Sequence, residues 1–232
     1  MRRFPLMIFA AGFGTRMGAL ARDLPKPLIP VAGRCLIDRA LDLAAQAPVG
    51  RVVVNLHYKG AQLERHLQDR EVALACEAEI LDTGGGLKAA LPLLGGGPVM
   101  TLNPDAVWTG PNPLATLAQT WTDEMAGLLL VAPNAAVLGR AGGPADFRMD
   151  AEGRLTRANG ATDGMVYLGA QIVQSDWVAD WPEAKFSMNR IWDQMIAAGQ
   201  LRAVLHRGGW CDVGTPEGIL AAEALLRGDA DG

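Results

Sequence analysis

The sequence predicts an α/β fold with a mainly parallel central sheet and an antiparallel portion that follows it. Over residues 1–131 short apolar runs alternate with amphipathic stretches, which is the pattern of repeated βαβ units. From residue 147 onward the segments become short, and a turn at 151–153 separates two of them as in a hairpin. With 232 residues, 50% of them hydrophobic and 20% charged, the chain can bury a large core without disulfides or a structural metal.

Each expected element has a local reason. Residues 6–10 form a continuous apolar run, as in a strand buried on both faces, and a loop is expected from there to Pro30. Asn112 followed by Pro113 predicts a capped helix start. Further strands are expected at 51–56, 72–76, 98–102, 127–131, 166–173, 201–206 and 210–213, a hairpin at 147–158, helices at 36–44, 61–67, 86–91, 188–198 and 215–227, and a frayed tail at 228–232.

Composition and charge exclude several classes of protein. Lys plus Arg is 21 and Asp plus Glu is 25, giving a net charge of −4 with no long basic run, so we expect no nucleic-acid partner. No stretch approaches the roughly 18 apolar residues of a membrane span, and Pro5 interrupts the apolar N-terminus. The three cysteines, at 35, 76 and 211, form no CxxC pair, which favours a reducing, cytoplasmic location over a disulfide framework.

A small-residue turn follows the first expected strand. Gly12, Gly14 and Thr15 let the backbone approach a ligand, their amides are suited to phosphate oxygens, and Arg16 adds a planar donor group. A tight turn that merely uses glycine at positive φ is about equally compatible with this pattern. The spacing excludes a P-loop, and the lack of a third glycine disfavours a dinucleotide loop.

Ten residues further on, Lys26 lies between two prolines. The prolines fix the backbone, so the ammonium group is held in place. Taken alone, this tripeptide is more typical of a rigid surface turn. Together with the glycine turn, however, it supplies two cations and a row of amides to one site.

The combined motifs resemble the sugar-1-phosphate nucleotidyltransferases. The resemblance begins with AAGFGTRM and LPKPLIPVAGRCLID, continues through residues 82–86 and 102–105, and ends at 210–215, so it spans nearly the whole chain in family order. It is greatest to the short single-domain type that includes N-acetylmuramate-1-phosphate uridylyltransferases. It implies one Rossmann-like domain over 1–232, with a nucleotide-binding part to about 131, a sugar-binding part at about 132–214 and a C-terminal helix at 215–227.

The resemblance also implies roles for individual residues. Asp105 and Asp212 would bind Mg²⁺, which prefers oxygen ligands and shares them with phosphates, although either aspartate alone is more often a cap or turn residue. Arg16 would bind the β- and γ-phosphates, and Lys26 would lie near the α-phosphate. Besides these two cations, the nucleotide would contact Ala11, Gly12, Gly14, Thr15, Asp82, Thr83, Gly84 and Gly85, and the sugar would contact Gly169.

The implied reaction is Mg²⁺-dependent transfer of a nucleotidyl group from an NTP to a sugar 1-phosphate. UTP and N-acetylmuramate 1-phosphate, in cell-wall recycling, are the expected substrates, and a monomer or small homo-oligomer is expected. The alternatives are a guanylyltransferase for mannose or heptose 1-phosphate, a CTP:phosphocholine cytidylyltransferase, and a non-catalytic nucleotide sensor. The sequence departs from the family at Pro104, where glycine is usual, and at 157–162, which lacks the lysine of larger members.

Overall fold

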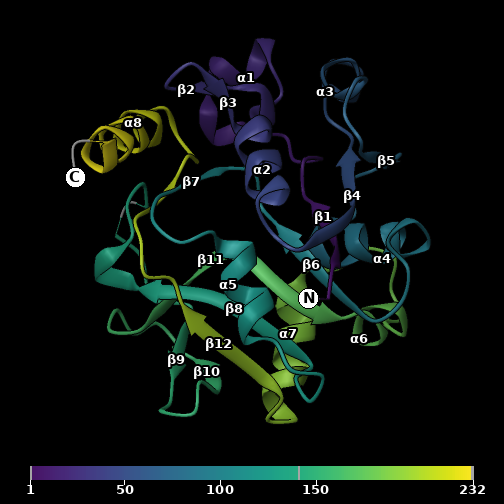
Figure 1. Ribbon diagram of the computed structural model, residues 1–232, viewed down its shortest axis with the longest axis vertical. Coiled ribbons are helices and arrows are strands. Elements are labelled where there is room, and N and C mark those ends of the chain that lie inside the picture. Colours follow the sequence, from purple (N-terminus) through teal and green to yellow (C-terminus); the bar gives the residue numbers. More distant parts are fainter. Residues whose placement is uncertain (1, 141, 231–232) are drawn as a thin grey trace.

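The computed structural model describes residues 2–140 and 142–230. Strand β1 (Phe4–Ile8) lies inside the main sheet and pairs in parallel with β4 (Val49–Leu56) on one side and β6 (Pro98–Leu102) on the other. β5 (Ala73–Cys76) extends the parallel set beyond β4. This arrangement, visible in Figure 1, confirms the predicted parallel centre.

The other half of the sheet is joined through the long strand β11 (Met165–Gln174), which is antiparallel to both β6 and β8 (Gly127–Pro133). β12 (Leu201–Leu205) pairs in parallel with β8, and the predicted hairpin is present as β9 (Phe147–Met149) and β10 (Leu155–Arg157). The expected strand at 127–131 is present as β8, but it is not a direct neighbour of the parallel set, because β11 lies between β6 and β8. β11 is mostly apolar and is buried along most of its length, as expected of a strand in this central position.

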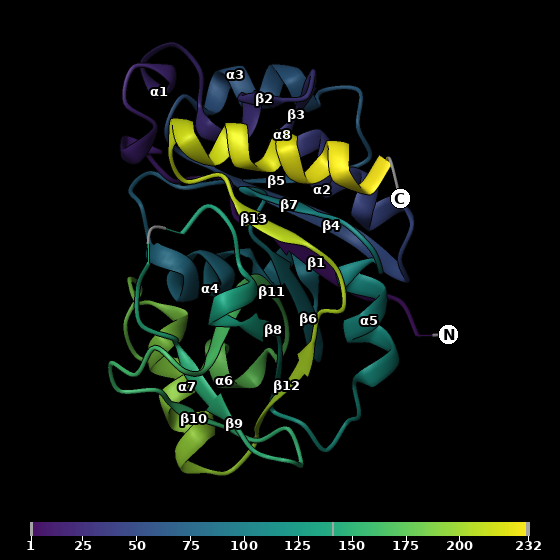
Figure 2. The same ribbon diagram turned by 90° about the vertical axis from the view of Figure 1, so that its left-hand side faces the viewer.

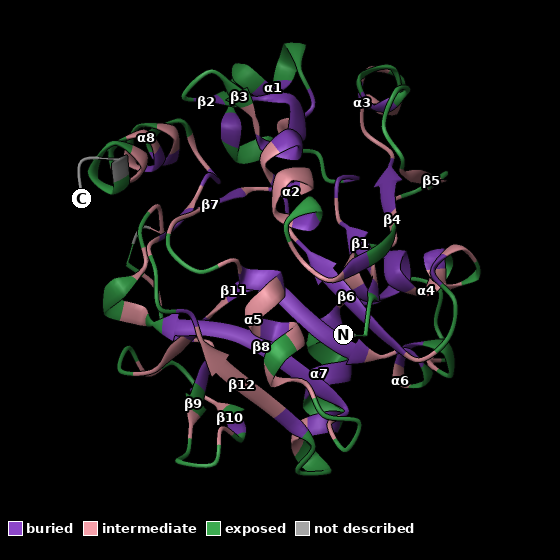
Figure 3. Ribbon diagram, in the orientation of Figure 1, coloured by how far each residue is buried: buried purple, intermediate pink, exposed green. Residues whose placement is uncertain are grey.

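Helices cover both faces of the sheet. On one face α2 (Leu36–Ala45), α3 (Gly60–Leu67) and α5 (Pro113–Thr120) pack on one core cluster. On the other face α4 (Asp82–Leu94), α6 (Asp176–Ala179) and α7 (Met188–Ala197) pack on a second cluster. Figure 2 shows these layers from the side, and Figure 3 shows that the central strands β1, β6, β8 and β11 are largely buried.

The predicted cap of α5 is present: the Asn112 side chain accepts hydrogen bonds from the amides of Leu114 and Ala115. The expected loop up to Pro30 is instead partly ordered into short elements that pack on a third core cluster containing Met17 and Ile29. Its short, mixed sequence has no helical or strand period long enough to reveal them. These elements are η1 (Thr15–Met17), α1 (Leu20–Asp23), η2 (Lys26–Leu28) and β2 (Pro30–Val31), the last paired with β3 (Arg34–Cys35).

The last helix, α8, runs from Pro216 to Ala230, beyond its predicted end at 227. One glycine, Gly228, does not stop it, since glycine costs a helix only about 1 kcal/mol relative to alanine. The rest of the expected frayed tail, residues 231–232, lies outside the described residues. Cys35, Cys76 and Cys211 are free cysteines, as predicted. Among the described helices, none is long and apolar enough to cross a membrane.

Candidate active site

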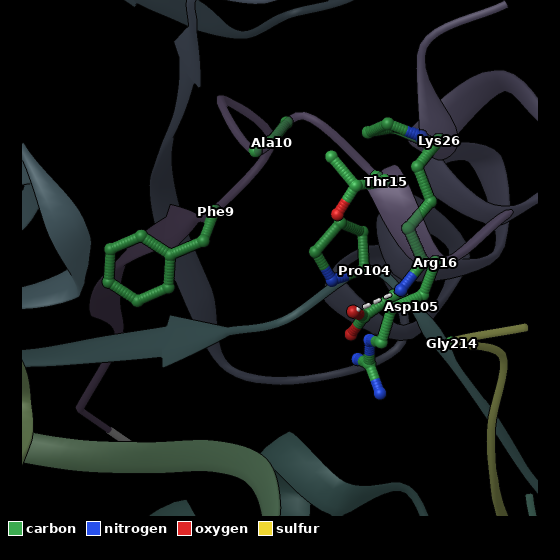
Figure 4. A pocket seen from close by; sticks show the side chains of 11 residues that line it. Phe9, Ala10, Thr15, Arg16, Lys26, Pro104, Asp105 and Gly214 are labelled. Carbon is green, nitrogen blue, oxygen red and sulfur yellow. Dashed lines mark hydrogen bonds and ion pairs between the residues drawn. The ribbon is translucent and has the colours of Figure 1, made fainter. Parts of the chain in front are cut away.

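A cleft opens where β1 ends and the glycine turn begins. This cleft, cleft A, has a volume of about 220 Å³ and is shown in Figure 4. Gly14 has a φ of 63°, and a Cβ on it would lie 2.9 Å from Cβ of Lys26, so glycine lets the turn pack directly on η2. Cleft A is lined by Phe9, Ala10, Gly12, Gly14, Thr15, Arg16, Lys26, Pro27, Pro104, Asp105 and Gly214.

Lys26 is directed into this cleft rather than into solvent. Its side chain is only 12% exposed, and its Nζ lies 2.6 Å from Oδ2 of Asp105, the contact drawn in Figure 4. Pro25 has a φ of −65° and Pro27 lies within η2, so the backbone on both sides of the lysine is fixed. The alternative of an exposed surface turn is therefore wrong for this lysine.

Asp105 and Asp212, which are 107 positions apart in the sequence, are brought together by a two-stranded ribbon. β7 (Ala106–Trp108) pairs antiparallel with β13 (Trp210–Asp212), and Asp212 is opposite Ala106. The amide of Val213 donates to the carbonyl of Asp105 at 2.8 Å. Figure 2 shows β7 and β13 side by side below α8. This ribbon brings the two aspartates near enough for the charge of Asp105 to act on Asp212, as the predicted metal site requires, although of the two only Asp105 lines cleft A itself.

The charges in the cleft are balanced but crowded. The Asp212 side chain is 16% exposed, and Nη1 of Arg16 lies 3.9 Å from its Oδ2. Burial and the nearby charge of Asp105 raise the pKa of Asp212, while Lys26, Arg16 and Arg140 act in the opposite direction. Two converging carboxylates, one of them largely desolvated, provide the hard oxygen donors that Mg²⁺ prefers, and their mutual repulsion favours a cation. The donor set therefore fits Mg²⁺.

This crowding leads to a prediction about stability. Because the pKa of Asp212 is raised in the folded state, ionisation of this carboxylate lowers the free energy of unfolding. This destabilisation is absent below the ordinary aspartate pKa, grows as the pH rises from that value to the raised pKa, and is complete above the raised pKa. We expect Asp212→Asn to make the metal-free protein more stable at pH 7 while lowering turnover. Urea unfolding in EDTA between pH 3.5 and 8 tests this: the advantage of the variant should widen with pH. A difference in free energy of unfolding between variant and wild type that does not change with pH would contradict the raised pKa of Asp212.

A second cleft, cleft B, also borders Asp105 and has a volume of about 250 Å³. It contains four of the predicted nucleotide contacts: Ala11, Gly12, Asp82 and Thr83. Phe9, Gly12 and Asp105 line both clefts, so clefts A and B form one continuous surface. The complete lining of cleft B is Phe9, Ala11, Gly12, Asn55, Glu77, Ile80, Asp82, Thr83, Asn103 and Asp105.

The run at 84–86 belongs to a helix that begins earlier than the predicted start at residue 86. It lies in the first turns of α4, which begins at Asp82. The amides of Gly84 and Gly85 both donate to the carbonyl of Phe186, at 2.9 and 3.0 Å, and neither residue is among those that line cleft B. Three glycines in a row predict a loop because they weaken a helix, but here the missing side chains allow close packing against a distant segment. Their contact with the nucleotide stays an untested prediction.

Two polar side chains next to this helix were not among the predicted site residues. Asn55 accepts a hydrogen bond from the amide of Ala10 at 2.6 Å and donates to Glu77 at 2.7 Å. Glu77 also accepts from the amide of Leu81 at 3.1 Å. This bridge joins the end of β1 to the start of α4, the two segments that flank cleft B. A polar residue near the end of a buried strand was the only sequence signal for Asn55, and such residues are common.

Gly169 has a structural role that does not require a sugar. Its φ is 86°, and a Cβ would lie 3.0 Å from Cβ of Asn103. Asn103 donates its amide to the Gly169 carbonyl at 2.7 Å, and the pairing of β11 with β8 shifts register around this point. Gly169 does not line cleft A or B among the described residues, so sugar contact at this position stays a prediction. Tyr167, two residues earlier, packs on Trp192.

Taken together, the site is one suited to handling phosphate groups. A parallel sheet presents, at its carboxyl edge, a glycine turn, two cations and two converging carboxylates, and ligands of open α/β sheets bind at this edge. Such a site can hold a polyphosphate and neutralise charge that develops on it.

The comparisons with known proteins agree with this class. Residues 6–175 match the family model for the MobA-like NTP transferase domain. The N-acetylmuramate alpha-1-phosphate uridylyltransferase of Caulobacter vibrioides is 38% identical over 232 aligned residues, covering 95% of this chain and 96% of the relative. The fold is similar to that of HddC from Yersinia pseudotuberculosis (TM-score 0.78, 20% identity, 96% of this chain and 99% of the other) and of a UDP-glucose pyrophosphorylase crystallised with UDP-glucose (TM-score 0.76, 15% identity, 98% and 99%).

The chain therefore belongs to the MobA-like NTP transferase family, and it is a nucleotidyltransferase with a Rossmann-like fold.

Proposed function

We propose that this protein transfers a uridylyl group from UTP to N-acetylmuramate 1-phosphate, releasing pyrophosphate. The single observation that carries the chemistry is the convergence of Asp105 and Asp212 opposite Lys26 and Arg16. The name of the full-length relative supports the choice of substrates, since that protein is 38% identical across 95% of this chain. NTP substrates and three free cysteines suit a reducing, cytoplasmic compartment.

In the proposed reaction an oxygen of the sugar phosphate attacks the α-phosphorus of UTP. The bond from this phosphorus to the bridging oxygen of the β-phosphate breaks, and the electron pair leaves with pyrophosphate. No general base is required, because the second pKa of a phosphate monoester is about 6 and the attacking group is already anionic. The protein's task is to align the two reactants and to neutralise charge.

The residues of cleft A, with the neighbouring Asp212 and the residues of cleft B, divide this work. Lys26 points toward Asp105, where the α-phosphate and the incoming phosphate would meet, so it reduces the repulsion between two anions. Arg16, with a 67% exposed side chain at the rim, is placed to hold the departing pyrophosphate. Bound Mg²⁺, held by Asp105 and Asp212, would supply further stabilisation of the charge on the phosphate oxygens. Asp82 and Thr83 in cleft B would face the base and ribose.

The test is a matrix of four NTPs against a panel of acceptors, read by pyrophosphate release and by mass spectrometry of the products. We expect release that requires Mg²⁺, with UDP-N-acetylmuramate as the dominant product. Higher activity with GTP and mannose or heptose 1-phosphate, or with CTP and phosphocholine, would replace the proposed substrates. Nucleotide binding without any release would replace the enzyme by a sensor.

A further inference from the structure

A third cleft, cleft C, is lined by Asp212 and Arg16. Cleft C has a volume of about 760 Å³, against about 220 Å³ for cleft A, and Arg16 lines both. A substrate phosphate held between the two aspartates therefore has a larger space beside it. Cleft C is lined by Arg16, Gly139, Arg140, Gly143, Asp212, Thr215, Glu217, Gly218 and Ala221.

The position of Arg140 at this cleft is set by backbone pairing. The amide of Leu138 donates to the carbonyl of Trp210 at 3.1 Å, and the amide of Asp212 donates to the carbonyl of Leu138 at 2.9 Å. A Cβ on Gly139 would lie 2.0 Å from the carbonyl oxygen of Asp212, so the chain passes directly over the end of β13. Arg140 follows at once, and its charge acts on the Asp212 carboxylate.

The guanidinium of Arg140 is half-buried and only lightly engaged. Its side chain is 28% exposed, with Nη1 3.3 Å from Oδ2 of Asp146 and Nη2 3.5 Å from the carbonyl of Pro144. Asp146 also accepts the amide of Tyr167 at 2.9 Å, which holds it and therefore orients the arginine. A guanidinium has five N–H donors in a planar arrangement that matches a carboxylate, and these contacts leave donors for a ligand.

Besides Asp212, cleft C is lined by one more acidic residue, Glu217, whose carboxylate already accepts hydrogen bonds from the protein. Its own amide and the hydroxyl of Thr215 hold the carboxylate and lower its pKa, as expected at the start of a helix. Arg140 is not among the residues that line cleft A, where Lys26 and Arg16 serve the phosphates. The cation at Arg140 is therefore left for a second anionic group. Because the base and ribose are assigned to cleft B, cleft C is the space that we assign to the sugar.

We propose that Arg140 binds the lactyl carboxylate of the acceptor sugar and so selects N-acetylmuramate 1-phosphate over N-acetylglucosamine 1-phosphate. The two sugars differ by this anionic ether group. The inference rests on the proposed function, since it identifies the chemical feature by which that site reads its acceptor. Arg140 is a specificity-determining residue in this scheme and takes no part in the phosphoryl chemistry.

The experiment measures kcat and KM of wild type, Arg140→Ala and Arg140→Lys with both sugar phosphates at saturating UTP, and the KM for UTP separately. A charge-assisted contact is worth roughly 10- to 100-fold in affinity. We expect Arg140→Ala to raise KM for N-acetylmuramate 1-phosphate by about that factor, with kcat/KM for N-acetylglucosamine 1-phosphate and KM for UTP within about threefold of wild type. Arg140→Lys, which retains the charge without the planar fork, should recover part of the loss.

The matched control is Arg148→Ala, which removes an exposed arginine paired with Asp163. This variant should leave kcat and KM unchanged with both sugar phosphates. An equal loss with both sugars, or a rise in KM for UTP, would overturn the inference while leaving the proposed function intact. If the wild-type protein does not use N-acetylmuramate 1-phosphate, both the inference and the proposed function are wrong. Thermal unfolding of each variant shows whether it is folded. If Arg140→Ala is unfolded, the comparison of the two sugar phosphates is made with Arg140→Lys, and that comparison tests the inference.

Discussion

Replacing Asp105 by asparagine is expected to lower kcat at least about 100-fold, because loss of one metal ligand removes several kcal/mol of charge stabilisation from the transition state. The substitution also removes the partner of Lys26, whose Nζ is 2.6 Å from the carboxylate. The asparagine has nearly the same shape, so the β7–β13 ribbon and its backbone hydrogen bonds should remain. Pyrophosphate release over a range of Mg²⁺ concentrations, at saturating substrates, measures the effect.

Asp163→Asn is the matched control for this variant, since Asp163 is an exposed aspartate paired with Arg148 on the surface. It should have wild-type turnover at every Mg²⁺ concentration. Turnover of Asp105→Asn within threefold of wild type would show that Asp105 is not a metal ligand. Recovery of activity at high Mg²⁺ would instead agree with the assignment, because a weakened site is filled by mass action.

The second large effect is expected for stability. A Cβ on Gly85 would lie 2.2 Å from the carbonyl oxygen of Ala184 and 3.0 Å from Cβ of Leu81. The first of these atoms is backbone, so relief requires α4 to move away from the segment that precedes α7. We expect Gly85→Ala to lower the free energy of unfolding by about 2–4 kcal/mol, as for other overpacked sites, measured by urea denaturation.

Gly228→Ala provides the control for helix propensity. Gly228 also lies in a helix, α8, but a Cβ there meets no atom within 4 Å. Alanine restricts the unfolded chain and is the better helix former, so this variant should be more stable by about 0.4–1 kcal/mol. If Gly85→Ala were stabilising as well, the close packing of α4 described here would be wrong.

Local sequence patterns were sufficient for most of the fold. The apolar run at the first strand, the β-branched run at 51–56 and the Asn112-Pro113 helix start each predict an element that the structure contains. These signals depend on neighbours a few residues apart, through burial of both strand faces or through a capping side chain. The elements that were missed, such as η2 and β2, are two or three residues long and carry no period that a sequence can reveal.

By itself, the sequence determined the alternation of strands and helices and the glycine turn, lysine and aspartates that mark a phosphate-handling protein. Only the tertiary structure decided three further features. It inserted β11 between β6 and β8, it made residues 84–86 the tightly packed start of a helix, and it brought Asp105 to Asp212 through the β7–β13 ribbon. All three depend on contacts between residues far apart in the chain, whose energies override local propensity and leave no local pattern in the sequence.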